Sequence, residues 1–253
     1  YGCINLNLTA VQDMPNFKGT VSTFGFLRGC TAITTVNNIN KWDVSKIRVF
    51  RSMFREMLIF NDNIGNWNTS SGVSFLAMFF AGNTTCVFGI FYHDHSDSIK
   101  NWNTSKAVSF NTMFTNQKNF NREVGLWDVS NVTDLNAMFS TGALAANIGT
   151  FNNAGSPSIS NWNTSKVTNM LQLFQGQRFF NQPIGNWDTS KVTNMSFMFY
   201  ASFVNGLTGA FNQDISNWDT GNVTNMNSMF FHQPAFNQNI GNWNVSKVTN
   251  FSF

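Results

Sequence analysis

Hydrophobic and polar residues follow a pattern that repeats along the chain and is marked by tryptophan. Counting each tryptophan as position 0, large apolar residues recur at positions 8, 11 and 12, and an Ile or Val recurs at position −3. The spacings between tryptophans are 25, 35, 25, 35, 25, 31 and 25 residues. Self-similarity at such a period indicates a tandem-repeat protein. The repeat anchors are Trp42, Trp67, Trp102, Trp127, Trp162, Trp187, Trp218 and Trp243.

The pattern predicts two elements in each coil. In the coil of Trp187, apolar residues at positions 5, 8, 11 and 12 have the spacing of one face of a short helix, with Asp188 or Ser190 as its N-cap. The preceding segment, residues 180–187, alternates apolar and polar residues and predicts a short strand or extended run. We therefore expect an α/β solenoid, leucine-rich-repeat-like, of about eight to nine stacked coils of 25–35 residues.

The repeats divide the chain into two parts. Residues 39–253 form the predicted tandem-repeat solenoid, whereas residues 1–38 match the repeat poorly and are expected to form an N-terminal cap or a degenerate repeat. In six coils an asparagine directly follows a phenylalanine that recurs at a fixed position. We expect these side chains to bond backbone groups of adjacent coils and form a ladder, because a residue that recurs at a fixed position is a feature of the fold. They are Asn61, Asn121, Asn152, Asn181, Asn212 and Asn237.

Every second coil is longer than its neighbours. In the coils of Trp67, Trp127 and Trp187, the step between two phenylalanines is 12 residues instead of 6, so the true unit is a double coil. The inserts contain apolar residues, and two interpretations stay open: an exposed ridge that marks an interface, or a cover over the core. The apolar insert residues are Phe88, Ile90, Leu144, Ile148, Phe203 and Leu207.

Composition predicts a neutral, hydrogen-bonding surface. Charged residues make up 11% of the chain and hydrophobic residues 42%, while 39 residues are asparagine. The net charge is +3 and there is no run of Lys or Arg, so nucleic-acid binding is not expected. No apolar stretch approaches the length of about 20 residues that a membrane span needs. We therefore expect a protein that does not span a membrane.

The three cysteines leave two interpretations open. Cys3 and Cys30 both precede the regular repeats and form the preferred pair for a disulfide that closes the cap; alternatively all three thiols, Cys86 included, are reduced and buried. If the chain is secreted by a eukaryote, the sequon at Asn83, which lies in an insert, is the best glycosylation candidate.

One cluster consists of histidines and aspartates, residue types that bind metal ions in other proteins. His93, Asp94, His95 and Asp97 lie close together in a second insert, and they indicate either a weak transition-metal site or a solvated polar loop. Nothing equivalent recurs in the sister insert, so we expect no metal and no cofactor. The sequence contains no nucleophile elbow, phosphate loop or zinc-protease motif. We therefore expect no enzymatic activity.

The repeat resembles a known family. The segments Trp162–Met170, with the sequence WNTSKVTNM, and Phe211–Thr220, with the sequence FNQDISNWDT, are similar to the repeats of BspA-like leucine-rich-repeat surface proteins. The resemblance covers about residues 39–253 and is specific at several positions per coil. It implies an extracellular or cell-surface protein with a role in adhesion or surface architecture, and it carries no catalytic residues.

Two functions follow as expectations. The first is a non-enzymatic extracellular repeat protein with a structural or adhesive role, whose partner is a protein or glycan on a surface or matrix. The second is a self-assembling filament subunit that stacks head-to-tail on copies of itself, because the sequence stops mid-coil at Phe253. The sequence begins at Tyr1, without Met, as expected for a processed product or a segment of a longer protein.

Overall fold

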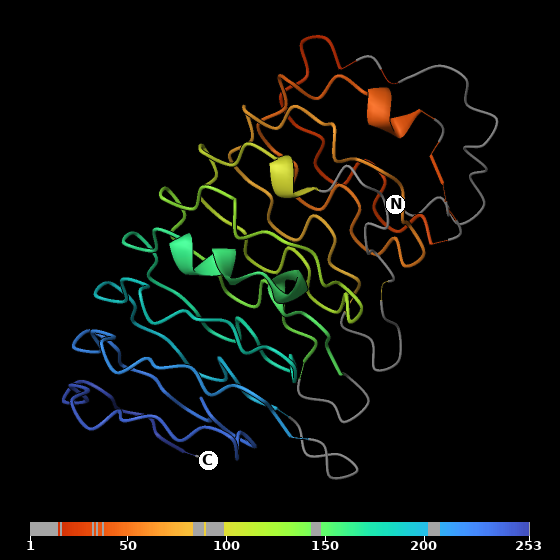
Figure 1. Cartoon of the computed structure of the whole chain (residues 1–253). Helices are drawn as coiled ribbons and strands as arrows, with labels where there is room; N and C mark the ends of the chain where they lie inside the picture. Colours follow the sequence, from red (N-terminus) through yellow and green to blue (C-terminus); the bar gives the residue numbers. More distant parts are fainter. Residues whose placement is uncertain are drawn as a thin grey trace.

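In a computed structural model, the chain forms a stack of coils that follow one another in sequence order (Figure 1). The described residues nearest the N-terminus, in red and orange, and those nearest the C-terminus, in blue, lie at opposite ends of the stack. The structure describes residues 15, 17–31, 33, 35, 36, 38–82, 89, 99–142, 148–201 and 208–252.

Single parallel β-bridges at position 7 connect each coil to the next. They begin at Ser22, which pairs with Val49, and end at Asn225, which pairs with Asn250. A further parallel bridge joins Gly149 to Gln177. Among the described residues these bridges stay isolated and none extends into a strand. The bridges at position 7 join Ser22, Val49, Ser74, Ser109, Asp134, Asn169, Asn194, Asn225 and Asn250 in that order.

The predicted α/β coil of a strand plus a helix is wrong. Along positions 8–14, every second backbone N–H is donated to a carbonyl of the next coil instead of to its own segment. At position 12, for example, Phe114 donates to Met138 at 2.9 Å and Phe174 donates to Met198 at 3.0 Å. A helix needs those N–H groups for bonds within the segment, so the segment predicted as helical is a series of tight turns.

The backbone at position 10 explains why a helix does not form. The residue there has a φ of 49–57° in each coil from Trp42 to Trp218, which is the left-handed region. A left-handed residue interrupts a right-handed helix and reverses the chain, so that positions 8, 11 and 12 still face inward. The residues are Ser52, Ala77, Thr112, Ala137, Gln172, Phe197 and Ser228.

The helices of the described chain are short and of the 3-10 type. They are η2 (Ile39–Lys41), η3 (Ile99–Asn101), η4 (Asn153–Gly155) and η5 (Pro157–Asn161). Of these, η2, η3 and η5 end directly before a tryptophan, whose backbone N–H bonds to the carbonyl at position −3. The predicted N-cap Asp188 instead accepts the N–H of Ser190 at 2.9 Å in a turn.

The segment predicted to be extended is held by side chains. The predicted asparagine ladder is confirmed from Asn121 to Asn237, whereas Oδ1 of Asn61 is buried without a partner among the described residues. The backbone N–H of Asn152 donates to Asn121 Oδ1 at 2.8 Å, and that of Asn181 donates to Asn152 Oδ1 at 3.0 Å. The same bond joins Asn212 to Asn181 and Asn237 to Asn212, each at 2.9 Å. The amide side chain thus takes the place that a neighbouring strand's carbonyl has in a sheet.

Aromatic columns fill the core. Phenylalanines at position 12 stack face to face in successive coils, with ring centroids 5.5 Å apart for Phe79–Phe114 and 5.9 Å for Phe139–Phe174. A second phenylalanine column lies against the first, as in the Phe174–Phe180 pair at 3.7 Å. Stacked rings bury large apolar surfaces in a regular geometry, and this repetition fixes the register of the coils.

The stack extends to the N-terminal side of the first tryptophan. Backbone N–H groups of Thr23, Gly25, Leu27 and Gly29 donate to carbonyls of residues 49–55 in the same alternating manner as between later coils. The division of the chain at residue 38 stays a prediction.

Candidate functional site

The tryptophans connect successive coils through their indole N–H groups. From Trp67 to Trp243, each Nε1 donates to the carbonyl oxygen at position −3 of the preceding coil, at 2.7–3.2 Å. The tryptophans from Trp42 to Trp218 are at most 6% exposed, and Trp243 is partly buried. Nε1 of Trp42 has no partner among the described residues. The indole column therefore adds a directional bond to the apolar core.

Recurring threonines also form hydrogen bonds between coils through their hydroxyl groups. The hydroxyl of Thr164 at position 2 donates to the carbonyl of Asp188 in the next coil at 2.9 Å, and Thr104, Thr189 and Thr220 make the equivalent bond. The exposed threonines at position 6 donate to the preceding coil in the same manner, as Thr193 does to Thr168 at 3.1 Å. These threonine columns therefore bond neighbouring coils to one another.

Glutamines of the short coils hold the inserts of the long coils at their base. Nε2 of Gln177 donates to the carbonyl of Phe139, where the insert begins, and its Oε1 accepts the N–H of Phe151 at 2.8 Å, where the insert ends. Gln233 makes the same two contacts with Phe199 and Phe211. Nε2 of Gln117 likewise donates to the carbonyl of Phe79, at 2.6 Å. We call Gln117, Gln177 and Gln233 the bridging glutamines.

Each bridging glutamine lies against a glycine of the insert. A Cβ atom added at Gly89, Gly149 or Gly209 would overlap the amide of Gln117, Gln177 or Gln233 respectively. The backbone N–H of each glycine also donates to the carbonyl just before its glutamine, at 2.9–3.1 Å. A side chain at these glycines would therefore displace the contact that closes the insert.

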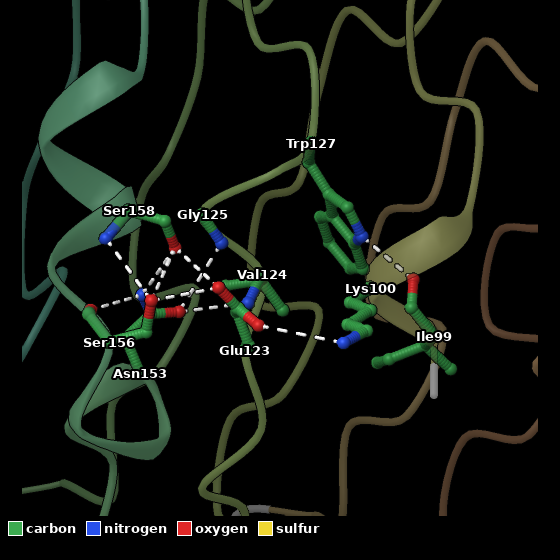
Figure 2. A network of polar contacts seen from close by, with 9 residues as sticks. All are labelled: Ile99, Lys100, Glu123, Val124, Gly125, Trp127, Asn153, Ser156 and Ser158. Atoms are coloured by element: carbon green, nitrogen blue, oxygen red, sulfur yellow. Dashed lines mark hydrogen bonds and ion pairs between the residues drawn. The ribbon is translucent and has the colours of Figure 1, made fainter. Parts of the chain in front are cut away.

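A second insert, before Trp162, forms the polar network in Figure 2. The side chain of Asn153 is fully buried; its Oδ1 accepts the N–H groups of Val124 at 2.8 Å and Gly125 at 3.2 Å. Its Nδ2 donates to the carbonyl of Ser156 at 2.7 Å and to Oγ of Ser158 at 3.2 Å. Asn153 therefore ties the loop formed by η4 and η5 to the preceding coil.

A carboxylate completes this network. Oε1 of Glu123 accepts the hydroxyls of Ser156 at 2.8 Å and Ser158 at 2.9 Å, while Oε2 lies 3.9 Å from Nζ of Lys100 (Figure 2). These two hydroxyl bonds, and to a lesser extent the charge of Lys100, lower the pKa of Glu123 below its ordinary value. The carboxylate is a charged acceptor that holds the loop, and no second carboxylate lies within the network.

Sequence reasoning missed both arrangements, although signals for them exist. A glutamine at position 15 recurs in three short coils, and a glycine recurs two residues before a phenylalanine in the three long coils. Each such glutamine lies in the short coil that directly follows a long coil with such a glycine, and this alternation is the signal that links the two residues. Asn153 lies two residues after its phenylalanine, as His93 does in the sister insert, so the polar second insert itself was visible.

Most of the residues singled out in the predicted cap and inserts lie outside the described residues. This holds for Cys3, Asn83, the His93–Asp97 cluster, Phe88, Ile90, Leu144, Phe203 and Leu207. Ile148 is described and is half-buried, and Cys30 is buried. The predicted disulfide, the glycosylation site, and the choice between an interface and a cover for the inserts all stay predictions.

Within the described part of the chain, no group of three or more His, Cys, Asp or Glu residues is arranged to hold a metal ion. The helices described there are all too short to span a bilayer.

The repeats place the chain in a family. A family model described as Mycoplasma protein of unknown function, DUF285, matches residues 22–147, 85–200 and 144–253, which together span nearly the whole stack. The chain belongs to the DUF285 family. Three overlapping matches to one model are what a tandem-repeat protein produces, so the DUF285 match and the stacked coils agree. No curated protein and no solved structure matches the chain.

Proposed function

We propose that this DUF285 chain is a non-enzymatic, extracellular or cell-surface repeat protein, BspA-like, with a structural or adhesive role. The observation that carries the proposal is that the recurring polar side chains are used between coils. The indole N–H groups, the asparagine ladder and the threonine hydroxyls all bond neighbouring coils. A scaffold of this kind is suited to displaying a binding surface. Catalysis would need residues that occur once in the chain and not in every coil.

The bridging glutamines support presentation at one edge of the stack. Gln177 and Gln233 hold the two ends of an insert in adjacent long coils, so the bases of successive inserts recur at every second coil. Regularly spaced loops on a rigid scaffold are a common way to bind an extended partner. The proposed partner is a protein or glycan on a surface or matrix.

Surface labelling tests the location. Intact cells that produce the protein are treated with a membrane-impermeant biotin reagent, and the chain is then recovered and compared with a cytoplasmic marker. We expect the chain to be labelled while the marker is not. Labelling of the chain after lysis alone contradicts an extracellular position.

Array binding tests adhesion. The purified chain is applied to glycan and matrix-protein arrays, beside a Gln177→Ala, Gln233→Ala variant whose insert bases are loosened. We expect binding that weakens in this variant, while Gly221→Ala, which changes no insert, binds as the parent does. Binding at background level for the parent chain contradicts an adhesive role.

The non-enzymatic part of the proposal is tested at the histidine cluster. A hydrolase activity that is lost on His93→Ala would contradict it.

End-to-end self-assembly stays a prediction, and electron microscopy of concentrated purified chain tests it: discrete monomers count against filaments.

A further inference from the structure

One coil departs from the repeat on the face formed by positions 6, 9 and 13. In the coil of Trp42 all three positions are arginine, namely Arg48, Arg51 and Arg55. In the later coils these positions hold Val, Thr, Leu, Asn, Ser, Gln, Phe or Tyr, and none is basic. A residue type that occurs in a single coil is not required for stacking, so these arginines call for another explanation.

The preceding coil places apolar side chains beside the arginines. The backbone N–H of Arg48 donates to the carbonyl of Val21 at 2.8 Å, and the guanidinium of Arg51 lies 5.5 Å from the ring centroid of Phe24. Val21 is 56% exposed and Phe24 is 58% exposed. The arginine patch consists of Val21, Phe24, Arg28, Arg48, Arg51 and Arg55.

Positive charge is concentrated in the segment of the sequence that contains this patch. Residues 15–62 contain seven of the 15 basic and three of the 12 acidic residues, which gives this segment a net charge of +4 in a chain of +3. Glu56 pairs with Arg28 at 3.4 Å and with Arg55 at 3.0 Å, so it neutralises part of the charge. Arg48 and Arg51 are exposed and form no ion pair with another described residue. The central part of the patch therefore presents two cations to solvent.

We propose that the arginine patch binds the surface of a bilayer that contains anionic phospholipid. Arg48 and Arg51 contact the phosphates, while Phe24 and Val21 enter the boundary between headgroups and acyl chains. The inference goes beyond the proposed function and does not rest on it.

The combination of charge and exposed apolar surface favours a bilayer over a hydrated anionic polymer. Basic residues near an anionic membrane each add to the binding energy, and apolar side chains such as Phe enter the boundary between headgroups and acyl chains in proteins that lie on a membrane. A polymer in water satisfies the arginines but leaves Val21 and Phe24 exposed. Aromatic contacts also hold the guanidinium groups in place, since Arg55 lies 4.5 Å from the ring centroid of Phe80.

Vesicle sedimentation tests the proposal with the full chain. The probes are vesicles of phosphatidylcholine with and without phosphatidylglycerol, at low and high salt. We expect binding to the anionic vesicles alone. The Arg48→Gln, Arg51→Gln variant should bind about thirtyfold more weakly, as the loss of two surface charges predicts. Phe24→Ser should weaken binding severalfold at both salt concentrations, because its contribution is apolar.

The matched control removes two charges elsewhere. Lys191→Gln, Lys247→Gln has the same net charge as the double arginine variant. We expect its binding at high salt to stay within about twofold of the parent, because these lysines lie five and seven coils away from the arginines and charges beyond a Debye length of the membrane are screened. Equal weakening in both variants, or no binding to anionic vesicles at low salt, overturns the proposal. So does arginine-dependent binding to heparin with none to vesicles, which assigns the patch to an anionic polymer. Unchanged urea midpoints show that the variants fold.

Discussion

At the scale of single residues, the indole of tryptophan combines burial with a directional bond. Trp127 is 2% exposed, and its Nε1 donates to the carbonyl of Ile99 at 2.8 Å. Trp42 is almost as buried but its Nε1 has no partner among the described residues. The two residues therefore separate the contribution of the ring from that of the bond.

We expect Trp127→Phe to destabilise the chain by about 1 kcal/mol more than Trp42→Phe does. Both substitutions lose the same volume, but only the first removes a buried hydrogen bond, which has a net value of about 1 kcal/mol. Urea unfolding followed by circular dichroism measures the difference. Equal shifts of the two midpoints would show that the indole bond adds nothing.

The glycine beside each bridging glutamine gives a second prediction. Gly149→Ala should destabilise the chain by about 1–3 kcal/mol, because its Cβ would overlap Gln177 in a packed site. The cost should fall when Gln177→Ala is also present, which makes the two changes non-additive. Gly221→Ala, at a position that is serine in most coils, is the control and should be close to neutral. Additive costs for Gly149 and Gln177 would contradict the contact.

At the scale of the element, the sequence predicted the period, the inward positions and the asparagine ladder, but not the local structure. A spacing of i, i+3 and i+7 fits a helix face, and it equally fits successive turns that each return a side chain to the core. The left-handed residues that decide between the two include Thr112, Gln172 and Phe197. None of the position-10 residues is Gly or Asn, the types that signal this conformation, so pairing between coils imposes it without a local signal.

The second insert is also an element whose stability depends on pH. The pKa of Glu123 is lowered in the folded chain, mainly by hydrogen bonds from Ser156 and Ser158. A lowered carboxyl pKa stabilises the folded state above the unfolded pKa of about 4.3, and this contribution disappears as pH falls through the folded value. We therefore expect Glu123→Gln to be less stable than the parent near neutral pH and to approach it in acid.

Urea midpoints of the parent and Glu123→Gln chains between about pH 7 and pH 3 test this window. The comparison is made as a difference, because the pKa values of Asp43, Asp188 and Asp214 are also lowered by hydrogen bonds from serines. A gap between the two midpoints that stays constant with pH would contradict the charge-dependent contact.

At the scale of the whole molecule, aromatic stacking and neutral hydrogen bonds hold the coils together. Charged residues make up 11% of the chain, and three ion pairs occur among the described residues. Surface pairs contribute little and are screened by salt. We expect the urea midpoint to change little between low and high NaCl concentration, in contrast to vesicle binding. A marked fall in the midpoint with NaCl would show that ion pairs matter more than their number indicates.

The absence of α-helix from the described coils is testable on the whole chain. We expect the infrared amide I band to lack the α-helical component, because the backbone donors of positions 8–14 bond between coils. Infrared is preferable to far-ultraviolet circular dichroism, since stacked aromatic rings absorb there. A dominant α-helical component would contradict the turn structure and favour the helix that the sequence pattern predicted.

The contact between a bridging glutamine and the insert before it bears on how such genes change in length. Gln177 and Gln233 lie in short coils and bond the ends of inserts in the preceding long coils. Unequal recombination that removed one coil would place two long or two short coils together and leave one of these partners without the other. Recombination by two coils preserves every contact. Natural length variants of this chain should therefore differ by whole pairs of coils.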